Sequence, residues 1–466
     1  MFEHTHPRRR RVLKLLVASI VAANRAAIAA GHETNARTPG AQVELELLAL
    51  RLIQAPEVQE AMAQARSILL ADPVAATPDG QASLDDAAMQ HAYAAVQRVT
   101  NLDPHHPRIL VISQYEHEVA GRTFPSALHG GLENPDNVYR VIPISHDSRY
   151  LLRGIRHRPA PAQVTYELKT TVPGLRYSLG DRAAAPIKAD AEMGDQISML
   201  QDRDMAISAD GSFTITIDAD PANGRPNHIQ TTEQARVLFI RDTLSDWTRQ
   251  THDGLAIERV AGPQTPPRSE QALIDAAAEV VVSFTRFWSE FKHGYIGRNR
   301  ESYTVNRKVP VRARAGGWGF IVNTHYAVKD DEALIVTTDP LDAPYFSIML
   351  GNHWWIAMEA SRHTGSFNIA QASLNPDGTC TFVIANRDPG VHNWLDTGGI
   401  REGVIQIRWQ GTPPSMTTAE GALRDVKLVR LSRLREELPG HTVWLTPGQR
   451  RAQLLARHAS YKRRLA

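Results

Sequence analysis

The chain has 466 residues, of which 22% are charged and 42% are hydrophobic, so its composition is that of an ordinary globular protein. At about 100–200 residues per domain, this length predicts two or three domains. The single cysteine, Cys380, excludes a disulfide framework within the chain and a cysteine-rich zinc site. No apolar run approaches the length that crosses a bilayer, so we expect no integral membrane segment.

Basic side chains gather at the two ends of the chain. The 52 Lys and Arg residues outnumber the 50 Asp and Glu residues by two, but residues 1–14 and 449–466 are strongly basic and leave the middle acidic. A nucleic-acid-binding face needs concentrated basic side chains with interleaved aromatic rings. The middle of the chain has no such stretch, and we expect no nucleic-acid partner.

Residues 1–40 form a basic leader that is similar at its start to an export signal. Arg9–Lys14 (RRRVLK) resembles the twin-arginine pattern, a mildly apolar stretch follows over Leu15–Ala23, and Ala27–Ala29 offers a small-residue cleavage site. Against this, Arg25 interrupts the apolar tract, which is short for a signal. The alternative is a basic segment that runs into an amphipathic helix. The sequence slightly favours the cytoplasm and leaves export to the periplasm open.

Hydrophobic periodicity divides the rest of the chain into five regions. Residues 41–104 read as helices, the last of them opened by a cap at Ser83. Residues 105–266 have the short alternating runs and turn signals of an antiparallel β domain. A long helix within 267–300 carries an apolar stripe that must pack on a sheet or bridge two domains. Residues 301–435 again read as short strands, and 436–466 as a basic C-terminal helix. We find no internal repeat of fixed period.

These regions predict an α+β fold that is mainly β. We expect two antiparallel β-sandwich regions of jelly-roll-like type, joined by the long amphipathic helix, with a helical segment at the N-terminus and a helix at the C-terminus.

Three stretches carry a resemblance to a known family: Glu133–Arg140 (ENPDNVYR), Ala343–Ile348 (APYFSI) and Asp388–Asp396 (DPGVHNWLD). They resemble the bacterial family called "domain of unknown function twelve-fourteen", which often has a related N-terminal β domain. The resemblance covers about residues 105–412 and is most specific in the third stretch. It implies jelly-roll β-sandwich domains. It implies no reaction, because the family has none that can be carried over residue by residue.

The first cluster that could carry chemistry lies around one tight turn. Asp136 is a candidate general base, with Tyr139 as a second catalytic group and with Arg140 and Asn137 to orient a substrate. The alternative is structural, since Asn and Asp side chains often hold a turn by bonding their own backbone.

The second cluster follows the Asp388 turn. His392 could exchange protons with a substrate, and Asp396 could orient it or act as the acid partner. Trp394 offers a flat wall for a sugar or aromatic ring, beside Asn393 as a polar contact. The alternative is a loop that hydrogen bonds hold over a packed tryptophan. Trp318 is a further candidate ring-stacking wall.

A third group, His353, Glu359 and His363, has spacings that fit no established zinc arrangement, so we predict no metal site. Phosphate-binding loops, dinucleotide-binding glycine patterns and nucleophile-elbow serines are also missing from the sequence. We therefore expect no cofactor.

Two hypotheses about function remain open. The first is a cofactor-free acid–base enzyme of lyase or hydrolase type, acting on a sugar-like or small aromatic substrate in a cleft between the two β regions. The second is a non-catalytic β-sandwich protein that binds a carbohydrate or another ligand. The expected partner is a small molecule or glycan, and a homo-oligomer is left open.

Overall fold

The fold is given by a computed structural model, which describes residues 39–112, 115–119, 121–127, 131–171, 195–296, 305–314 and 319–464. The stretch near the N-terminus that resembles a twin-arginine signal and Trp318 lie outside these ranges. No helix within them is both long enough and apolar enough to cross a membrane.

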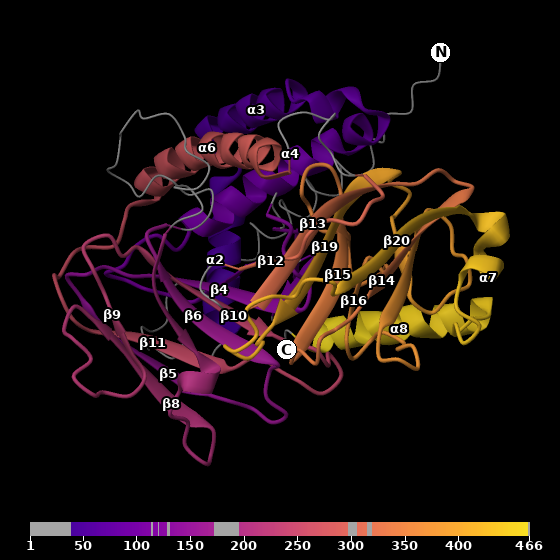
Figure 1. Ribbon diagram of the computed structural model, residues 1–466. Coiled ribbons are helices and arrows are strands. Elements are labelled where there is room, and N and C mark those ends of the chain that lie inside the picture. Colours follow the sequence, from indigo (N-terminus) through magenta and orange to yellow (C-terminus); the bar gives the residue numbers. More distant parts are fainter. Residues whose placement is uncertain are drawn as a thin grey trace.

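A layer of helices covers one side of the molecule (Figure 1). It consists of α2 (Pro39–Leu52), α3 (Pro56–Leu70), the short 3₁₀ helix η2 (Pro73–Ala76), α4 (Pro78–Val99) and α6 (Glu270–Ile296). The long helix α6 packs against α3 and α4, so it joins the N-terminal helices as well as linking the two β regions. Its apolar stripe, including Phe284 and Trp288, is buried there.

The start of α4 corrects one expectation. The cap is Thr77, whose hydroxyl oxygen accepts from the Gly80 amide at 3.0 Å, and not Ser83. Pro78 occupies the first turn, where its missing N–H costs nothing. The helix therefore begins six residues earlier than expected, and the Ser83 hydroxyl donates to the Asp79 carbonyl at 2.7 Å inside it.

The first β-sandwich pairs a five-stranded sheet, in the order β1-β4-β10-β6-β7, with a four-stranded sheet, in the order β11-β5-β8-β9. Its strands are β1 (Leu110–Ile112), β4 (Asn137–Pro143), β5 (Arg149–Ile155), β6 (Gln163–Lys169), β7 (Gln196–Gln201), β8 (Ser212–Asp218), β9 (His228–Gln230), β10 (Val237–Thr243) and β11 (Gly254–Ala261). Apolar side chains from the facing sides of both sheets form its core. The 3₁₀ helix η3 (Asp202–Asp204) follows β7, and a separate hairpin of β2 (His117–Val119) and β3 (Arg122–Phe124) lies beside α2.

The second β-sandwich pairs a five-stranded sheet, in the order β12-β13-β19-β15-β16, with a four-stranded sheet, in the order β18-β17-β14-β20. Its strands are β12 (Arg312–Ala313), β13 (Gly319–Ala327), β14 (Glu332–Thr338), β15 (Tyr345–Gly351), β16 (Ser366–Asn368), β17 (Cys380–Ala385), β18 (Trp394–Asp396), β19 (Glu402–Gln410) and β20 (Leu423–Arg430). The 3₁₀ helix η5 (Leu431–Arg433) and the helices α7 (Leu434–Glu437) and α8 (Pro447–Arg463) follow. Cys380 is buried in this core, and burial raises the pKa of its thiol to about 12.

The two sandwiches have the same topology. Taken in chain order, each strand of the first sandwich from β1 and β4 to β11 has a counterpart in the same sheet position of the second, from β12 to β20. In both four-stranded sheets, the corresponding pair (β8–β9 or β17–β18) is parallel, whereas the other pairs are antiparallel. The second sandwich is therefore a structural repeat of the first, which the sequence analysis did not detect.

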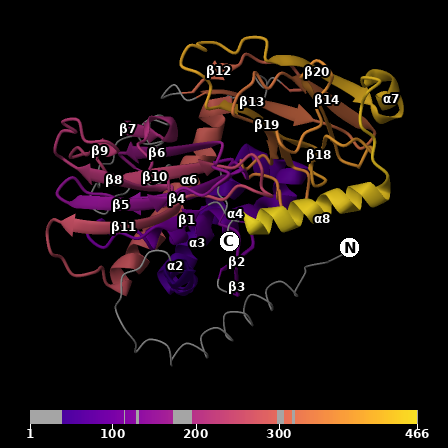
Figure 2. The same ribbon diagram turned by 90° about the horizontal axis from the view of Figure 1, so that it is seen from below.

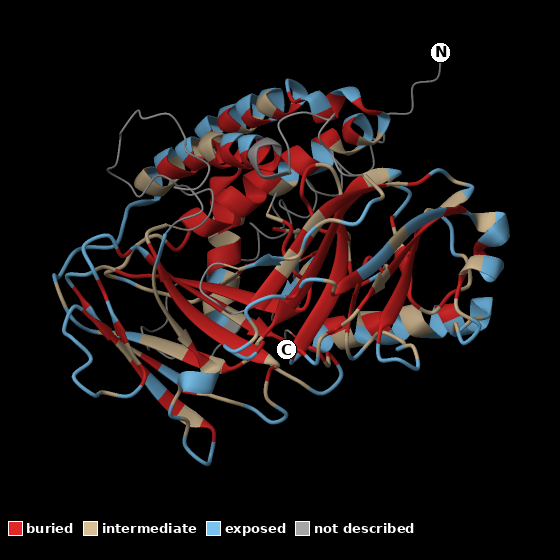
Figure 3. Ribbon diagram, in the orientation of Figure 1, coloured by how far each residue is buried: buried red, intermediate tan, exposed pale blue. Residues whose placement is uncertain are grey.

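The central strands β4, β6, β15 and β19 of the two five-stranded sheets are buried on both faces (Figure 3), whereas the edge strands β7 and β12 are partly exposed. One face of each five-stranded sheet packs on its own four-stranded sheet. The other contributes to a shared core under the helices, in which Tyr139 and Phe239 of the first sandwich join Met349 and Val404 of the second. Together the layers form an α+β fold that is mainly β, as the sequence predicted.

Candidate active site

A histidine and an aspartate of the second sandwich form an ion pair at the surface. His363 lies in the connection between β15 and β16, and Asp396 is the last residue of β18. The Nδ1 atom of His363 lies 2.8 Å from Oδ2 of Asp396. The imidazole side chain is 45% exposed, whereas the carboxylate side chain is only 15% exposed. The arrangement is a partly buried carboxylate that orients an accessible imidazole.

The backbone around both residues fixes this geometry. The Asp396 amide donates to the Thr364 carbonyl at 3.2 Å, and Oδ1 of Asp396 accepts from the Gly398 amide at 2.8 Å. Gly365 has no room for a side chain, because a Cβ atom there would lie 2.6 Å from Cβ of Met358. The strand end and the turn that carries His363 are thus packed directly against each other.

The charges around His363 favour its protonated form. Its pKa is raised, chiefly by the hydrogen bond to Asp396, with further attraction from Asp396 and Glu359 that outweighs the effects of burial and of Arg362. No group of the described residues bonds Nε2 of His363. This nitrogen can therefore exchange a proton with a molecule that approaches from solvent.

Asp136, the first predicted base, lies in the interface between the two sandwiches. Its side chain is fully buried. Oδ1 accepts from the Trp247 indole at 2.8 Å and from the Asn368 amide at 2.7 Å, while Oδ2 accepts from the Tyr345 hydroxyl at 2.5 Å. Burial raises its pKa although these bonds oppose the rise. Because Tyr345 and Asn368 belong to the second sandwich, this carboxylate joins the two β regions and is closed to a substrate.

The neighbours of Asp136 are also engaged in structural contacts. The Tyr139 hydroxyl accepts from the Asn134 backbone amide at 3.1 Å and from the Asn137 side chain at 2.9 Å. Arg140 is buried in an ion pair with Asp242, and its Nη1 donates to the Asp253 carbonyl at 2.6 Å. The structure therefore fits the structural alternative for this turn, in which the polar side chains hold the fold by hydrogen bonds.

His392 and Asp396 do not form the predicted pair. The Nδ1 atom of His392 lies 3.0 Å from the Asn393 side-chain oxygen, and its ring lies 6.1 Å from the Phe367 ring. Asp396 is bonded to His363 instead. The reason is their position: His392 precedes β18 and lies beside Phe367, whereas Asp396 ends β18 next to Thr364, in the turn that carries His363.

Asn393 and Trp394 are buried and hold the loop. The Asn393 amide donates to the Ser373 carbonyl at 2.8 Å, and its oxygen accepts from the Ser373 amide at 2.8 Å. The Trp394 indole donates to the Ala385 carbonyl at 2.9 Å, and the Arg450 guanidinium lies 5.0 Å from the centre of the ring. Trp394 therefore offers no open ring face in this structure.

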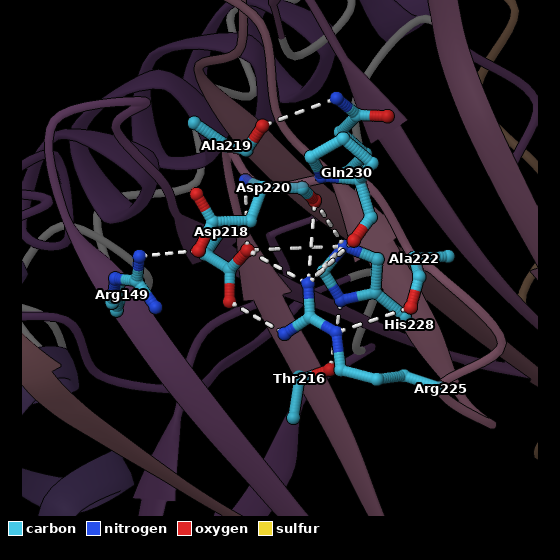
Figure 4. Close-up of polar contacts among 10 residues, drawn as sticks. Arg149, Thr216, Asp218, Ala219, Asp220, Ala222, Arg225, His228 and Gln230 are labelled. Atoms are coloured by element: carbon cyan, nitrogen blue, oxygen red, sulfur yellow. Dashed lines mark hydrogen bonds and ion pairs between the residues drawn. The ribbon is translucent and has the colours of Figure 1, made fainter.

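The corresponding loop of the first sandwich, between β8 and β9, is shown in Figure 4. Arg225 bonds both carboxylate oxygens of Asp218, at 3.1 and 3.3 Å. His228 accepts from the Thr216 hydroxyl at Nδ1 (2.8 Å) and donates through Nε2 to the Asp220 carbonyl at 2.8 Å. This Thr–His–Asp grouping is similar to a nucleophile with its base. However, the His228 side chain is only 1% exposed, so the cluster closes the loop and cannot receive a substrate.

His363 was missed as a proton-transfer residue because its partner is distant in sequence. The sequence analysis placed His363 in a group tested only for metal binding, and it assigned Asp396 to the nearer imidazole. A sequence signal would have required the strand order, which brings residue 396 beside residue 364. The described residues hold no group of three or more His, Cys, Asp or Glu side chains placed to bind a metal ion.

Comparisons with known proteins show the fold and leave the activity open. No protein-family model and no curated protein matches the chain. The chain is similar in structure to an uncharacterised protein from Burkholderia cenocepacia, with 21% identity and a TM-score of 0.65, over 82% of this chain and 99% of that one. The VPA0106 protein from Vibrio parahaemolyticus also matches, with 8% identity over 65% of this chain and 91% of that one, but its TM-score of 0.38 carries no argument. The α+β architecture is thus shared with a crystal structure, and the resemblance to domain twelve-fourteen stays a prediction.

Proposed function

We propose that this protein is a cofactor-free acid–base enzyme of lyase or hydrolase type, and that the pair of His363 and Asp396 transfers the proton. The observation that carries the proposal is the accessible imidazole with one nitrogen held by a carboxylate at 2.8 Å and the other open to solvent. A side chain in this position is oriented in advance for proton transfer, which typically contributes about 100- to 10,000-fold to a rate.

Each residue has a distinct part in the proposed reaction. In a hydrolase, Nε2 of neutral His363 takes a proton from the water that attacks the substrate, and in a lyase it takes one from an acidic C–H group; in both it returns the proton to the leaving group as the bond to that group breaks. Asp396 keeps the ring oriented and stabilises the imidazolium that forms. Glu359, whose side chain is 32% exposed, lies close enough to affect the charge on the ring and adds an acceptor for a hydroxylated substrate.

The same surroundings bear on the class of substrate. Glu359 and Glu116 both contact Arg362 beside His363, so acidic side chains outnumber basic ones around the proposed site. An anionic substrate would be repelled there. Trp394 is buried, so it cannot serve as the expected stacking wall for either a sugar or an aromatic ring. A neutral, sugar-like substrate fits the polar surface best.

The test is turnover of a panel of neutral glycosides and polyols by the natural protein and by His363→Gln. We expect the substitution to lower kcat at least 100-fold with an unchanged melting temperature, since the ring is exposed and its loss removes one surface ion pair. His392→Gln is the matched comparison. If turnover depends on His392 and is indifferent to His363, the proposed pair is wrong and the assignment made from sequence is restored.

The alternative is a non-catalytic ligand-binding protein. It would bind members of the same panel, measured by calorimetry, without turning over any of them. Binding without His363-dependent turnover would therefore overturn the enzyme proposal.

A further inference from the structure

One buried arginine of the C-terminal helix holds the turn that carries His363. Arg450 and Arg457 of α8 and Arg464, the residue that caps its C-terminus, recur every seven residues, and all three are buried. Residues seven apart lie on one face of a helix. Figure 2 shows α8 running along the second sandwich toward the middle of the molecule. Each arginine meets a different part of the protein, and the middle one meets the turn.

Arg457 bonds the turn on both sides of His363. Its Nε donates to the Ala360 carbonyl, and its Nη2 donates to the Ser366 hydroxyl at 2.6 Å. Ala360 and Ser366 lie three residues before and three residues after His363. A third donor, Nη1, lies 3.2 Å from the Gln371 side-chain oxygen. One rigid guanidinium therefore spans the base of the turn.

Only an arginine can make this set of contacts. The guanidinium presents donors in fixed, diverging directions, whereas the ammonium of lysine is a single point. The group is kept in place by the Trp247 ring, whose centre lies 4.7 Å away, and by the Phe367 ring at 6.0 Å. Burial also lowers the pKa of Arg457 to about 10, so it remains charged at neutral pH.

We propose that Arg457 is a positioning residue for the His363–Asp396 pair, because it clamps both ends of the turn that presents the imidazole. The inference rests on the proposed function for its catalytic meaning, although the clamp itself can be tested without a substrate. Arg457 has no contact with His363 or Asp396 and acts only through the backbone and side chain of the turn.

The experiment follows the ring of His363 by NMR as a function of pH. The groups that influence this ring are Asp396, Glu359 and Arg362, and all are kept. In Arg457→Met the turn loses its clamp, the contact with Asp396 lengthens, and the pKa of His363 should fall towards the ordinary histidine value. The signal is assigned by its loss in His363→Gln.

Arg464→Met is the matched control. Arg464 belongs to the same face of α8, but it donates to the Asn137 carbonyl at 3.2 Å in the first sandwich and does not contact the turn. We expect it to leave the pKa of His363 unchanged. An equal fall in both variants would mean that the docking of α8 as a whole is responsible, and an unchanged pKa in folded Arg457→Met would also overturn the clamp.

Two further variants keep the proposal testable. If Arg457→Met does not fold, Ser366→Ala removes only the Nη2 contact, and a smaller fall of the same pKa is then expected; no fall would overturn the clamp. Arg457→Lys should not restore the shift. In turnover assays Arg457→Met should lower kcat and leave KM nearly unchanged. If His363→Gln retains full turnover, the proposed function fails, while the NMR result still decides whether Arg457 holds the turn.

Discussion

Each sandwich has one connection between two parallel neighbouring strands. The two connections occupy the same place in the fold and differ in the side chains that hold them together. Residues 219–227 link β8 to β9, and residues 386–393 link β17 to β18 in the equivalent position. In both, the asparagine just before the second strand bonds a backbone amide and carbonyl: Asn227 bonds Ala206 at 2.8 and 2.7 Å, and Asn393 bonds Ser373 at 2.8 and 2.8 Å.

The difference lies in the arginine and in the last strand residue. Arg225 holds the first connection from within its own loop, whereas Arg450 holds the second from α8. At the end of the strand, Gln230 bonds the Ala219 carbonyl at 3.1 Å, whereas Asp396 bonds His363. The same connection thus occurs in both sandwiches. At the equivalent strand end, Gln230 in the first is replaced by Asp396 in the second, and Asp396 belongs to the candidate site.

The largest expected effect is a loss of stability on replacing Arg450, compared with a smaller loss on replacing Arg225. Arg450→Met leaves the carbonyls of Val391 and His392 without their buried guanidinium donor, and it removes the ion pair with Asp388, whose side chain is 34% exposed. We expect a loss of about 3 kcal/mol in the free energy of unfolding, because a buried carbonyl left without its donor costs about 1–3 kcal/mol and the partly exposed ion pair adds at most about 1 kcal/mol.

Arg225→Met is the comparison for this prediction. Its side chain is 35% exposed, and water can replace its bonds, so the expected loss is about 1 kcal/mol or less. Urea denaturation of both variants measures the difference. Equal losses would show that Arg450 of α8 stabilises the second connection no more than Arg225 stabilises the first.

The two asparagines should behave alike, which tests the equivalence of the two connections. Asn227→Ala and Asn393→Ala each remove a side chain that bonds both the backbone N–H and the backbone carbonyl of one residue. We expect losses of about 2 kcal/mol for each, since a buried group left unsatisfied costs about 1–3 kcal/mol. Asn393 also donates to the Thr381 carbonyl at 3.0 Å, so its loss should be the larger. Thermal and urea unfolding would contradict the equivalence if only one variant were destabilised.

Sequence patterns predicted the layers of this protein better than its polar contacts. Period-two and period-3.6 patterns located both β regions and α6, because each depends on local burial. The structural repeat was not visible, because the matching positions are few: Asp210-Gly211 and Asp377-Gly378 before β8 and β17, and the two asparagines.

The polar residues could not be sorted in the same way. Asp136 and His363 differ in access to solvent, because one is buried between the sandwiches and the other lies at the surface. Burial of this kind depends on which strands lie side by side and on where α8 docks. Neither can be predicted from a short window of sequence. The turn at Asp136 and the loop at His392 therefore had the residue types of a site, although their side chains are not open to a substrate.

The smallest expected change in stability comes from giving the second sandwich the strand-end residue of the first. Asp396→Gln removes the carboxylate that raises the pKa of His363. In the natural protein, the raised pKa means that the ion pair stabilises the fold at a pH below the ordinary histidine pKa of about 6.5, and that this contribution is lost as the pH rises through the raised value. The side chain of His363 is 45% exposed, so the stabilisation should not exceed about 1 kcal/mol.

Asp396→Gln should therefore unfold almost like the natural protein at high pH and slightly more easily at low pH. The acid limb of kcat/KM, which reports the deprotonation of His363 as a base, should move to lower pH in the same variant. Gln230→Glu is the control, since it puts a carboxylate at the equivalent position of the first sandwich, where no histidine plays the part of His363. An acid limb that stays in place in Asp396→Gln would show that this carboxylate does not tune the base, and the difference between the two strand ends would then have no bearing on catalysis.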